Sequence, residues 1–528
     1  MRMQPQSTTQ PRPEQHSARL AELIATLSLA TGLGMGQPME VPLRIARLAV
    51  ELGRVLGLQT ADLSDIYYLA LVTHIGCTSN SVEFAAFEGG DDIAFRRRAI
   101  SFPSSDPPEI LRAVVGHLGE ARPPFERARL VGAMLLHSQE RARQVAAATC
   151  EAGSRLAQRL GLSHGVIVGL GQQQERWDGK GLPDGLAGNE LSIARRVVAV
   201  AHDAVVVSTA GGSALDLVRA RRGRAYDPAV VDALLGMPLE ELLDLDLDKA
   251  ADAWADGLAA EPEPVATIEP ASLDGVALAC ADFTDLKSPY LLGHSARVAE
   301  LAAAAAEIAG LSRADVVDLR RAALLHDLGR VGVPNGVWDK AGPLNTSDME
   351  RVRLHAYYTE RILARSPILA SLAVIAGSHH ENLDGSGYHR GIGAAQLSQA
   401  ARLLRAADCV EAMSSTRPHR PALTADSRAR QLKLEVEAGR LDAAAVSATL
   451  EACGAERVRL RPPRPAGLSE REIEVLRLMV RGLSNPEMAS RLQLSAKTVG
   501  HHVQHIYDKI GVTSRAAAAL FAMEAGIV

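Results

Sequence analysis

The chain contains one layout twice, and this duplication limits its fold more than any single motif. Each half has an amphipathic helical pattern, a hydrophobic helical pattern ending in a Gly-containing turn, and a loop, which reads WDGKGLPDGLAG from Trp177 and LDGSGYHRG from Leu383. After a further helical pattern the halves also end alike, with RAYDPAVVDALL from Arg224 and GRLDAAAVSATL from Gly439. Repeats of this size indicate two copies of one domain rather than a single large core.

Composition favours helices in both copies. Hydrophobic residues make up 47% of the chain but aromatic residues only 3%, so the core must consist mainly of Ala, Leu and Val. Segments such as RVAELAAAAAEIAGL from Arg297 have high helix propensity, and we find no convincing strand ladder. The sequence therefore predicts an all-α fold.

The chain divides into folded units joined by polar segments. We predict a disordered N-terminus at 1–17, a first copy at 18–240 with an insertion at about 81–148, a linker at 241–271, a second copy at 272–455, a second linker at 456–466, and a C-terminal unit at 467–528. The first linker contains EPEPVATIEPAS from Glu261, whose prolines and acidic residues suit a solvated segment. The second, RVRLRPPRPAG from Arg457, is either a stiff solvated spacer or a basic segment that lies along phosphates.

No sequence feature predicts export or a membrane partner. The N-terminus is polar and Pro-rich, and no segment approaches the ~18 uninterrupted apolar residues of a spanning helix. The cysteines lie singly, without disulfide or zinc spacing, at Cys77, Cys150, Cys280, Cys409 and Cys453. We therefore expect a cytoplasmic protein. Its net charge of −5 means that any contact with DNA must be local.

The second copy holds a set of side chains that can bind metal. They are His294, His326, Asp327, His355, His379, His380 and Asp408. Imidazole and carboxylate groups suit two divalent transition ions such as Fe or Mn better than a Cys-rich zinc site. A single histidine of this kind is usually structural, but so many within one copy favour a metal centre.

Four blocks of the second copy resemble the HD-GYP family of metal-dependent phosphodiesterases. They are DLKSPYLLGHS from Asp285, HDLGRVGVPN from His326, HHENLDGSGYHRG from His379 and AMSSTRPHRP from Ala412. Across about residues 272–430, the resemblance implies an all-helical HD-domain bundle that binds two or three metals. Better-known members hydrolyse cyclic di-GMP. The resemblance also implies that the residues above are the ligands and that Asp327 bridges two ions.

The implied reaction is phosphodiester hydrolysis, in which a metal-bridging hydroxide attacks phosphorus while the ions neutralise phosphate charge. Asp327 and Arg330 are the predicted catalytic residues. Arg330 stands where the family has a lysine, and it cannot donate a proton near neutral pH. His389 replaces the proline of the GYP signature and brings a titratable ring. Tyr290 stands where some members have a glutamate, which favours two metals over three.

The first copy aligns with the second by two constant offsets. An offset of 253 residues places Val41, Thr73 and His74 opposite the first three candidate ligands. Beyond an insertion, an offset of 206 places Thr149, Gln173, Gln174 and His202 opposite the other four, so the insertion is 253 − 206 = 47 residues long. Val, Thr and Gln are poor ligands for these ions. We expect a degenerate, metal-free copy that packs or dimerises rather than senses a ligand.

Part of the insertion, from Glu88, mixes Gly, Pro and charged residues. Its acidic pair, Asp91 and Asp92, could attract a cation, but a loop lying across the surface is the default expectation.

The C-terminal unit shows the start and stop signals of four helices. Ser469 and Glu472 form a predicted capping box for the first helix, and Gly482 can close it. A short helix from Asn485 through Leu492, a tight turn, and a longer helix from Ser495 to about Ile510 make a helix-turn-helix.

This unit resembles the LuxR-type DNA-binding domain over its whole length, including LSEREIEVL, SAKTV and YDKIGV. The resemblance implies that 495–510 is the recognition helix, with Val499, Val503 and Ile506 packed inward. The predicted contacts to bases or phosphates are Lys497, Thr498, His501, His502, His505 and Lys509. Because charges of both signs nearly balance in this unit, we expect a homodimer to bind double-stranded DNA.

These observations predict a transcription regulator, and two functions stay open for the second copy. It hydrolyses a cyclic dinucleotide or another phosphoester, or it binds metal and nucleotide without turnover and serves as a sensor and dimerisation module. The complete ligand set favours hydrolysis, whereas Arg330 and His389 favour sensing. Arg402 and Arg417 are further candidates for phosphate contact, although salt bridges explain them equally well.

Overall fold

The computed structural model describes residues 18–87, 89–101, 125, 127, 138–239, 250–455, 460, 465–525 and 527. It confirms the all-α prediction, since the one sheet among these residues consists of two short strands. Strand β1 (Ala18–Arg19) pairs antiparallel with β2 (Thr267–Ile268) and so joins the starts of the two copies. The predictions for 1–17 and for most of 456–466 lie outside the described residues. No described helix is long and apolar enough to cross a membrane.

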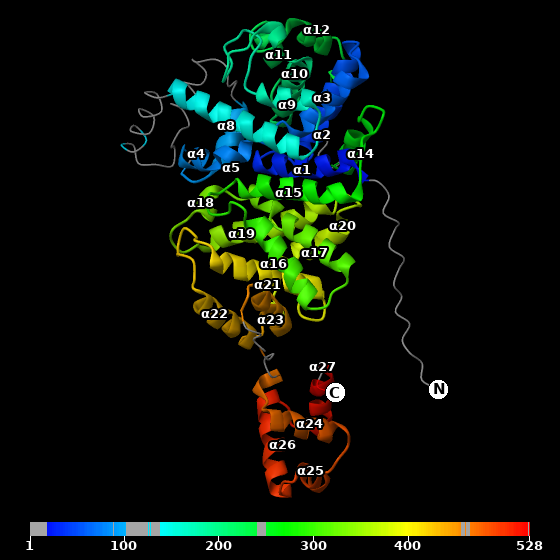
Figure 1. The fold of residues 1–528 in the computed structure, drawn as a ribbon, viewed down its shortest axis with the longest axis vertical. Coiled ribbons are helices and arrows are strands. Elements are labelled where there is room, and N and C mark those ends of the chain that lie inside the picture. Colours follow the sequence, from blue (N-terminus) through cyan, green and yellow to red (C-terminus); the bar gives the residue numbers. More distant parts are fainter. Residues whose placement is uncertain are drawn as a thin grey trace.

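Two bundles of helices form the upper and middle parts of Figure 1. The first contains α1 (Leu20–Gly34), α2 (Val41–Val55), α3 (Thr60–Val72), η1 (Cys77–Asn80), α4 (Ser81–Phe87), α5 (Asp92–Ser101), α8 (Ser138–Arg159), α9 (His164–Gly171), η2 (Gly188–Glu190), α10 (Ile193–Thr209), α11 (Ala214–Arg221), α12 (Pro228–Leu235) and α14 (Ala250–Ala259). The second contains η4 (Pro270–Ser272), α15 (Leu273–Asp285), α16 (His294–Ile308), α17 (Arg313–Leu325), η5 (Leu328–Gly332), α18 (Asn335–Trp338), α19 (Thr346–Leu363), α20 (Ala370–Gly377), α21 (Gln399–Ser414), α22 (Ala425–Glu437) and α23 (Ala443–Ala452).

Helix boundaries reproduce both sequence offsets. Helices α2 and α3 begin 253 residues before α16 and α17 and match them in length, at 15 and 13 residues. Helices α9 and α10 begin 206 residues before α20 and α21. Equivalent N-caps explain one shared boundary, because Ser192 and Ser398 each accept a hydrogen bond from a first-turn amide. Helix α8, which begins at Ser138, is the equivalent of α19 in the second copy. The predicted insertion range of 81–148 therefore extends too far.

The sequence predicted two copies rather than a single large core, but one hydrophobic core runs through both copies, with buried side chains of α1, α15, α17 and α20 in the same cluster. Helix α1 packs on η5 and α19 of the second copy. The approach is close, since a Cβ at Gly332 would lie 2.6 Å from Leu33 Cδ2. The first copy therefore packs directly against the second, which confirms the packing part of the expectation for it.

The predicted first linker, 241–271, is solvated only in part: 241–249 lies outside the described residues, Glu263, Pro264 and Glu269 are exposed, and Glu261 is not. Glu261 is only 6% exposed, because its carboxylate accepts hydrogen bonds from the Arg19 guanidinium and the Tyr68 hydroxyl. The preceding residues form α14, which packs on α2. A buried carboxylate with two donors is stable where an unpaired one would not be.

The expectation of a surface loop at Asp92 is wrong. Asp92 begins α5 and is fully buried between the copies, where it accepts hydrogen bonds from Arg96 and from Lys287 of the second copy, each at 2.8 Å. The cation that an acidic pair could attract is thus supplied by the chain itself.

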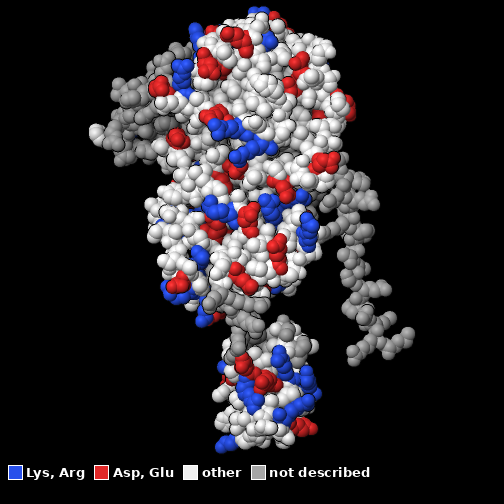
Figure 2. Space-filling model, in the orientation of Figure 1, with Lys and Arg blue, Asp and Glu red and all other residues white. Residues whose placement is uncertain are grey.

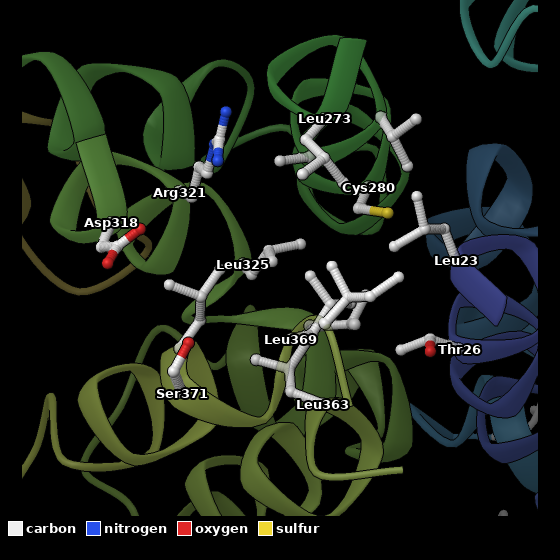
Figure 3. Close-up of a pocket in the computed structure, with 15 residues that line it drawn as sticks. Leu23, Thr26, Leu273, Cys280, Asp318, Arg321, Leu325, Leu363, Leu369 and Ser371 are labelled. Atoms are coloured by element: carbon white, nitrogen blue, oxygen red, sulfur yellow. The ribbon is translucent and has the colours of Figure 1, made fainter. Parts of the chain in front are cut away.

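An apolar cavity of about 50 Å³ lies between the copies, and Figure 3 shows its lining. Leu23 and Thr26 of α1 and Leu273 and Cys280 of α15 contribute to its wall. Burial raises the pKa of Cys280 to about 12, so its thiol stays protonated and behaves as apolar surface. Ligand pockets usually measure about 300–1,000 Å³, so this cavity is too small for a nucleotide.

The C-terminal helices form a core of their own. After η6 (Pro465–Gly467) come α24 (Glu470–Val480), α25 (Asn485–Leu492), α26 (Ala496–Ile510) and α27 (Arg515–Glu524). The predicted capping box between Ser469 and Glu472 is present, and α25 has the predicted bounds. Gln493 takes a left-handed conformation with φ of 54° in the tight turn between α25 and α26. The four-helix prediction is confirmed.

Candidate metal centre and recognition helix

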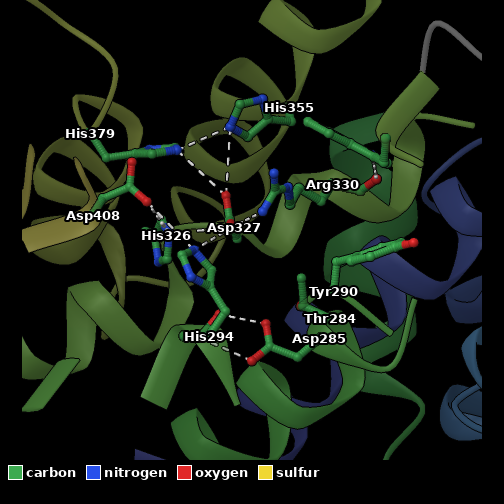
Figure 4. Close-up of polar contacts among 12 residues, drawn as sticks. Thr284, Asp285, Tyr290, His294, His326, Asp327, Arg330, His355, His379 and Asp408 are labelled. Carbon is green, nitrogen blue, oxygen red and sulfur yellow. Dashed lines mark hydrogen bonds and ion pairs between the residues drawn. The ribbon is translucent and has the colours of Figure 1, made fainter. Parts of the chain in front are cut away.

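The candidate ligands of the second copy surround one buried space, and Figure 4 shows most of them. Helix α16 begins with His294, α17 is followed by His326 and Asp327, α19 contains His355, α20 is followed shortly by His379 and His380, and α21 contains Asp408. All except His380 are buried, and three of the imidazoles have no exposed surface. The ends of α16, α17 and α20 and the interiors of α19 and α21 thus bring the whole predicted set together.

Asp327 lies at the centre, with its two carboxylate oxygens toward different histidines. Its Oδ2 lies 3.4 Å from His294 Nε2 and 3.3 Å from His326 Nε2. Its Oδ1 lies 3.5 Å from His379 Nε2 and 3.6 Å from His355 Nε2. A carboxylate arranged in this way can bridge two ions.

Hydrogen bonds on the other ring nitrogen orient four of the histidines. In His326, His355 and His379, Nδ1 donates to the backbone carbonyl three residues earlier. In His294, Nδ1 donates to the Glu411 carboxylate. Because these oxygens only accept, each Nδ1 carries a proton, so the Nε2 of His355 and of His379, whose pKa values burial lowers, presents a lone pair to the centre.

Lone pairs therefore converge around Asp327 Oδ1. His355 Nε2 and His379 Nε2 lie 3.0 Å apart, although both rings carry their proton on Nδ1. Burial lowers the pKa of His355 to about 3 and also lowers the pKa of His379, so neither ring gains a second proton near neutral pH. His326 Nε2 is buried without a hydrogen-bond partner in the described part of the chain. This donor set fits a metal cation.

The carboxylates of the centre stay charged. Burial alone would raise the pKa of Asp327, but Arg330 and His326 hold it well below its usual range. Burial is likewise outweighed at Asp408, whose pKa is lowered by its hydrogen bond to His294. Burial lowers the pKa of His294, but the neighbouring carboxylates raise it well above its usual value. Two buried anions thus attract positive charge to this point.

His380 and His389 do not share the hydrogen-bonding pattern of the other four histidines. The Nδ1 of His380 accepts a hydrogen bond from the Arg405 guanidinium at 3.2 Å, so its ring is oriented by a cation. The ring of His389 lies beside α19, with Nε2 2.9 Å from Glu360 Oε2. The titratable ring that replaces the family's proline therefore contacts α19 rather than the ligands.

Arg330 faces the centre directly. Its NH1 donates to Asp327 Oδ2 at 2.7 Å, and its guanidinium carbon lies 4.1 Å from the centroid of the Trp338 ring. Trp338 also makes an edge contact with His355, with ring centroids 5.4 Å apart. A stacked, planar guanidinium is held in one orientation more firmly than a lysine would be.

Of the two arginines predicted as candidates for phosphate contact, one lies beside the centre and the other does not. Arg417 lies beside the centre, with NH2 3.4 Å from Glu411 Oε2 and 3.5 Å from His294 Nδ1. Arg402 bonds to Asp442 at 3.0 Å and to two backbone carbonyls, so a structural role accounts for it.

Sequence reasoning missed three side chains of this site. Glu411 orients His294, Trp338 stacks on Arg330, and the ring of Tyr388 lies 4.8 Å from that of His380. Glu411 follows Asp408 by three residues on one helix, a spacing that puts both carboxylates on one face and could have indicated it. No local pattern indicates Trp338.

At the equivalent position in the first copy, the histidines form hydrogen bonds with each other and with their neighbours, and no lone pairs converge among the described residues. His74 Nε2 and His202 Nε2 lie 2.8 Å apart, Cys77 Sγ lies 3.6 Å from His74 Nδ1, and His202 Nδ1 lies 2.7 Å from Asp203 Oδ1. Burial raises the pKa of Cys77, so its thiol can donate to His74, His74 to His202, and His202 to Asp203. Each ring nitrogen then has a partner. The other equivalents, Val41, Thr73, Thr149, Gln173 and Gln174, carry no imidazole or carboxylate.

In the C-terminal unit, most of the predicted DNA contacts lie on the exposed side of α26. Lys497, Thr498, His501 and His505 are exposed, and His502 is half-buried. Val499 and Ile506 have no exposed surface, and Val503 is partly buried against the same core, as predicted. Lys509 differs, because its Nζ lies 2.7 Å from Glu472 Oε2 and ties α26 to the start of α24. Figure 2 shows charges of both signs side by side on this unit.

Comparison with known families and proteins agrees with this geometry. The family model described as "HD domain" matches residues 137–230 and 279–445, and the one described as "Bacterial regulatory proteins, luxR family" matches 466–522. The chain is 32% identical over 419 residues to 3'3'-cGAMP-specific phosphodiesterase 3 of Vibrio cholerae. This match covers 78% of this chain and 90% of that protein. It is 39% identical over 129 residues to a cyclic di-GMP phosphodiesterase of Thermotoga maritima, a match that covers 24% of this chain and 35% of that protein.

A crystal structure of a cyclic GMP-AMP specific phosphodiesterase of V. cholerae resembles the fold with a TM-score of 0.57 at 27% identity, covering 84% of this chain and 99% of that one. The protein is therefore a tandem HD-domain protein with a C-terminal helix-turn-helix. It belongs to the HD-GYP family of cyclic nucleotide phosphodiesterases, and its last domain is of the LuxR type. Both resemblances drawn from the sequence are confirmed.

Proposed function

We propose that this protein is a transcription regulator whose second HD copy hydrolyses a phosphodiester bond of a cyclic dinucleotide. Relatives named for cyclic GMP-AMP and for cyclic di-GMP support this substrate class. In this proposal the first copy, at about 18–240, is metal-free, the second, at about 272–455, is the enzyme, and 467–528 binds DNA as a homodimer.

The observation that carries the proposal is the convergence of Nε2 lone pairs on a buried carboxylate. Two groups have ligand atoms within 4.8 Å of one another, one formed by His294, His326 and Asp327 and the other by His355, His379 and His380. Asp327 presents one oxygen to each group. Such a pair of groups is a site for two divalent ions rather than a satisfied core.

The donor set fits Fe or Mn, with Asp408 completing the first group through its contact with His294. Bound there, the ions would supply an activated water nucleophile and neutralise charge on the phosphate. Arg330 and Arg417, which lie beside the centre, would pair with phosphate oxygens and orient the scissile group. A guanidinium does not release a proton near neutral pH, so the leaving oxygen takes its proton from another donor, such as solvent.

Sensing without turnover is a second candidate function. The contact that favours it is the one between Arg330 and Asp327, because a guanidinium on the bridging carboxylate cannot serve as general acid. In that case the second copy binds metal and nucleotide and transmits occupancy to the DNA-binding domain.

The deciding experiment measures metal content together with hydrolysis of cyclic GMP-AMP, cyclic di-GMP and a generic phosphodiester. Wild type is compared with Asp327→Ala and His379→Ala, and His202→Ala in the first copy is the matched control. We expect both second-copy variants to lose metal and turnover while the control keeps them. Bound metal with no turnover would select the sensor, and wild type without metal would reject both functions.

DNA binding is tested separately. Lys497→Ala with Thr498→Ala removes two exposed groups at the start of α26 and should weaken binding in a gel shift with genomic fragments selected by the wild-type protein. Lys509→Ala is the matched control, because its charge is already paired with Glu472. Unchanged affinity in the double variant would reject α26 as the recognition helix.

A further inference from the structure

A buried ionic junction joins the first copy to a loop of the active-site copy. Asp92 Oδ2 accepts hydrogen bonds from Arg96 NH1 and Lys287 Nζ, both at 2.8 Å, and all three side chains are at most 3% exposed. Arg96 is itself anchored in the first copy, where it donates to the Cys77 carbonyl at 2.8 Å and to Ser81 Oγ at 2.7 Å. The junction is thus rigid on the side of the first copy.

On the side of the second copy, the junction ends on the loop and short helix that follow η5. Asp92 Oδ1 accepts a hydrogen bond from the Asn335 amide at 2.9 Å, and the Asn335 side chain donates to the Lys287 carbonyl. The next amide, of Gly336, donates to the Gly90 carbonyl at 2.7 Å. Two consecutive amides of the second copy are therefore held by the insertion of the first.

Only glycine permits this approach. A Cβ at Gly336 would lie 2.5 Å from the Gly90 Cα, and a Cβ at Gly90 would lie 3.0 Å from the Gly336 Cα. Substitution of Gly336 would push the backbones apart without touching the ion pairs.

Two residues beyond Gly336 stands Trp338, whose ring lies under the Arg330 guanidinium and whose Nε1 donates to the Arg330 carbonyl at 3.3 Å. We propose that Asp92 and Gly90 of the first copy position Arg330 in the metal centre of the second, through the 335–338 segment and Trp338. Asp92 is a positioning residue, since it acts through Arg330 and does not reach the centre. This inference rests on the proposed function of Arg330 as a phosphate-binding group.

In this proposal the degenerate copy does more than pack against the second copy, because it holds Arg330 in position. A second ion pair between the copies, Arg365 NH2 with Glu40 Oε1 at 3.1 Å, does not involve that segment. Loss of this pair should leave Arg330 in place, whereas loss of the Asp92 junction should not.

The first test reads the position of Trp338 directly. The chain has three tryptophans, so Trp177→Phe with Trp254→Phe leaves Trp338 as the sole fluorophore. In this background we expect Asp92→Asn and Gly336→Ala to move the emission to longer wavelength and to increase quenching by acrylamide, with Glu40→Gln unchanged. Arg330→Ala should shift the emission by itself. Unaltered emission in both Asp92→Asn and Gly336→Ala would overturn the proposal.

The second test is a double-mutant cycle on turnover. Asp92→Asn and Gly336→Ala should each lower kcat/KM by about tenfold, as expected for a displaced phosphate-binding group, but have little effect when Arg330→Ala is already present. An equal loss in both backgrounds would mean a merely structural role and would overturn the proposal. If wild type hydrolyses nothing, the proposed function fails, and the Trp338 emission still decides this inference.

Discussion

The two HD copies share helix boundaries, yet they satisfy their central imidazoles in opposite ways. In the first copy, the pair His74 and His202 is part of a chain of donors from Cys77 to Asp203, so each ring nitrogen has a partner. In the second, the Nδ1 atoms of His355 and His379 each donate to a backbone carbonyl, so the Nε2 lone pairs of the two rings face each other. The copies therefore differ in which nitrogen carries the proton: His74 Nδ1 accepts from the Cys77 thiol, whereas both rings of the second-copy pair donate from Nδ1, which leaves two Nε2 lone pairs available to a cation.

The largest effect should come from making the second copy resemble the first. His379→Gln with His380→Gln reproduces the Gln173 and Gln174 of the first copy, and we expect metal content to fall below half and turnover by more than about 100-fold. Metal analysis and hydrolysis measure this. Gln173→His with Gln174→His is the reciprocal control and should gain no metal, because Val41 and Thr73 remain. A gain of metal there would break the comparison.

The next prediction tests whether the copies share one core. Leu23 of α1 is 2% exposed and lines the cavity between the copies. Leu23→Ala should lower the free energy of unfolding by about 2–5 kcal/mol, as for other buried leucines. Because one cluster spans both copies, the change should shift a single denaturant transition for the tandem. Two separate transitions, with only one of them moved, would show that the copies unfold independently.

A smaller effect is expected from the carboxylates that orient the histidines. Glu411→Gln weakens the hydrogen bond to His294 Nδ1 and should lower metal affinity by about 10–100-fold, measured by competition with a chelator. The matched change in the first copy, Asp203→Asn, removes the charge beside His202 Nδ1 and should leave metal affinity unchanged. Equal losses in the two variants would mean that both copies contribute to binding.

The smallest effect is expected at Cys77. Its thiol starts the donor chain of the first copy, so Cys77→Ala should leave His74 Nδ1 without that partner and cost about 1 kcal/mol of unfolding free energy. Thermal unfolding checks the stability, and metal content should stay unchanged. Cys453→Ala, at an exposed position, is the control. An altered metal content would show that the first copy takes part in the metal centre.

The sequence by itself determined most of the local structure. Capping residues and helical periodicity act over a few positions, so the bounds of α25 could be predicted from Asn485 and Leu492. The constant offsets of 253 and 206 located the equivalent helices because both copies keep the same element lengths. The candidate ligands could likewise be chosen in advance, since their side-chain chemistry and family motifs are local properties.

Tertiary structure alone decided which charges are buried and what they contact. Asp92 and Glu261 sit in stretches whose composition suits exposed loops, and each is buried because a cationic or hydroxyl partner arrives from a distant segment. The role of Trp338 and the tautomers of the histidines depend in the same way on neighbours that only packing supplies. A buried polar group is stable only when its partner is present, and that partner is set by the fold rather than by adjacent residues.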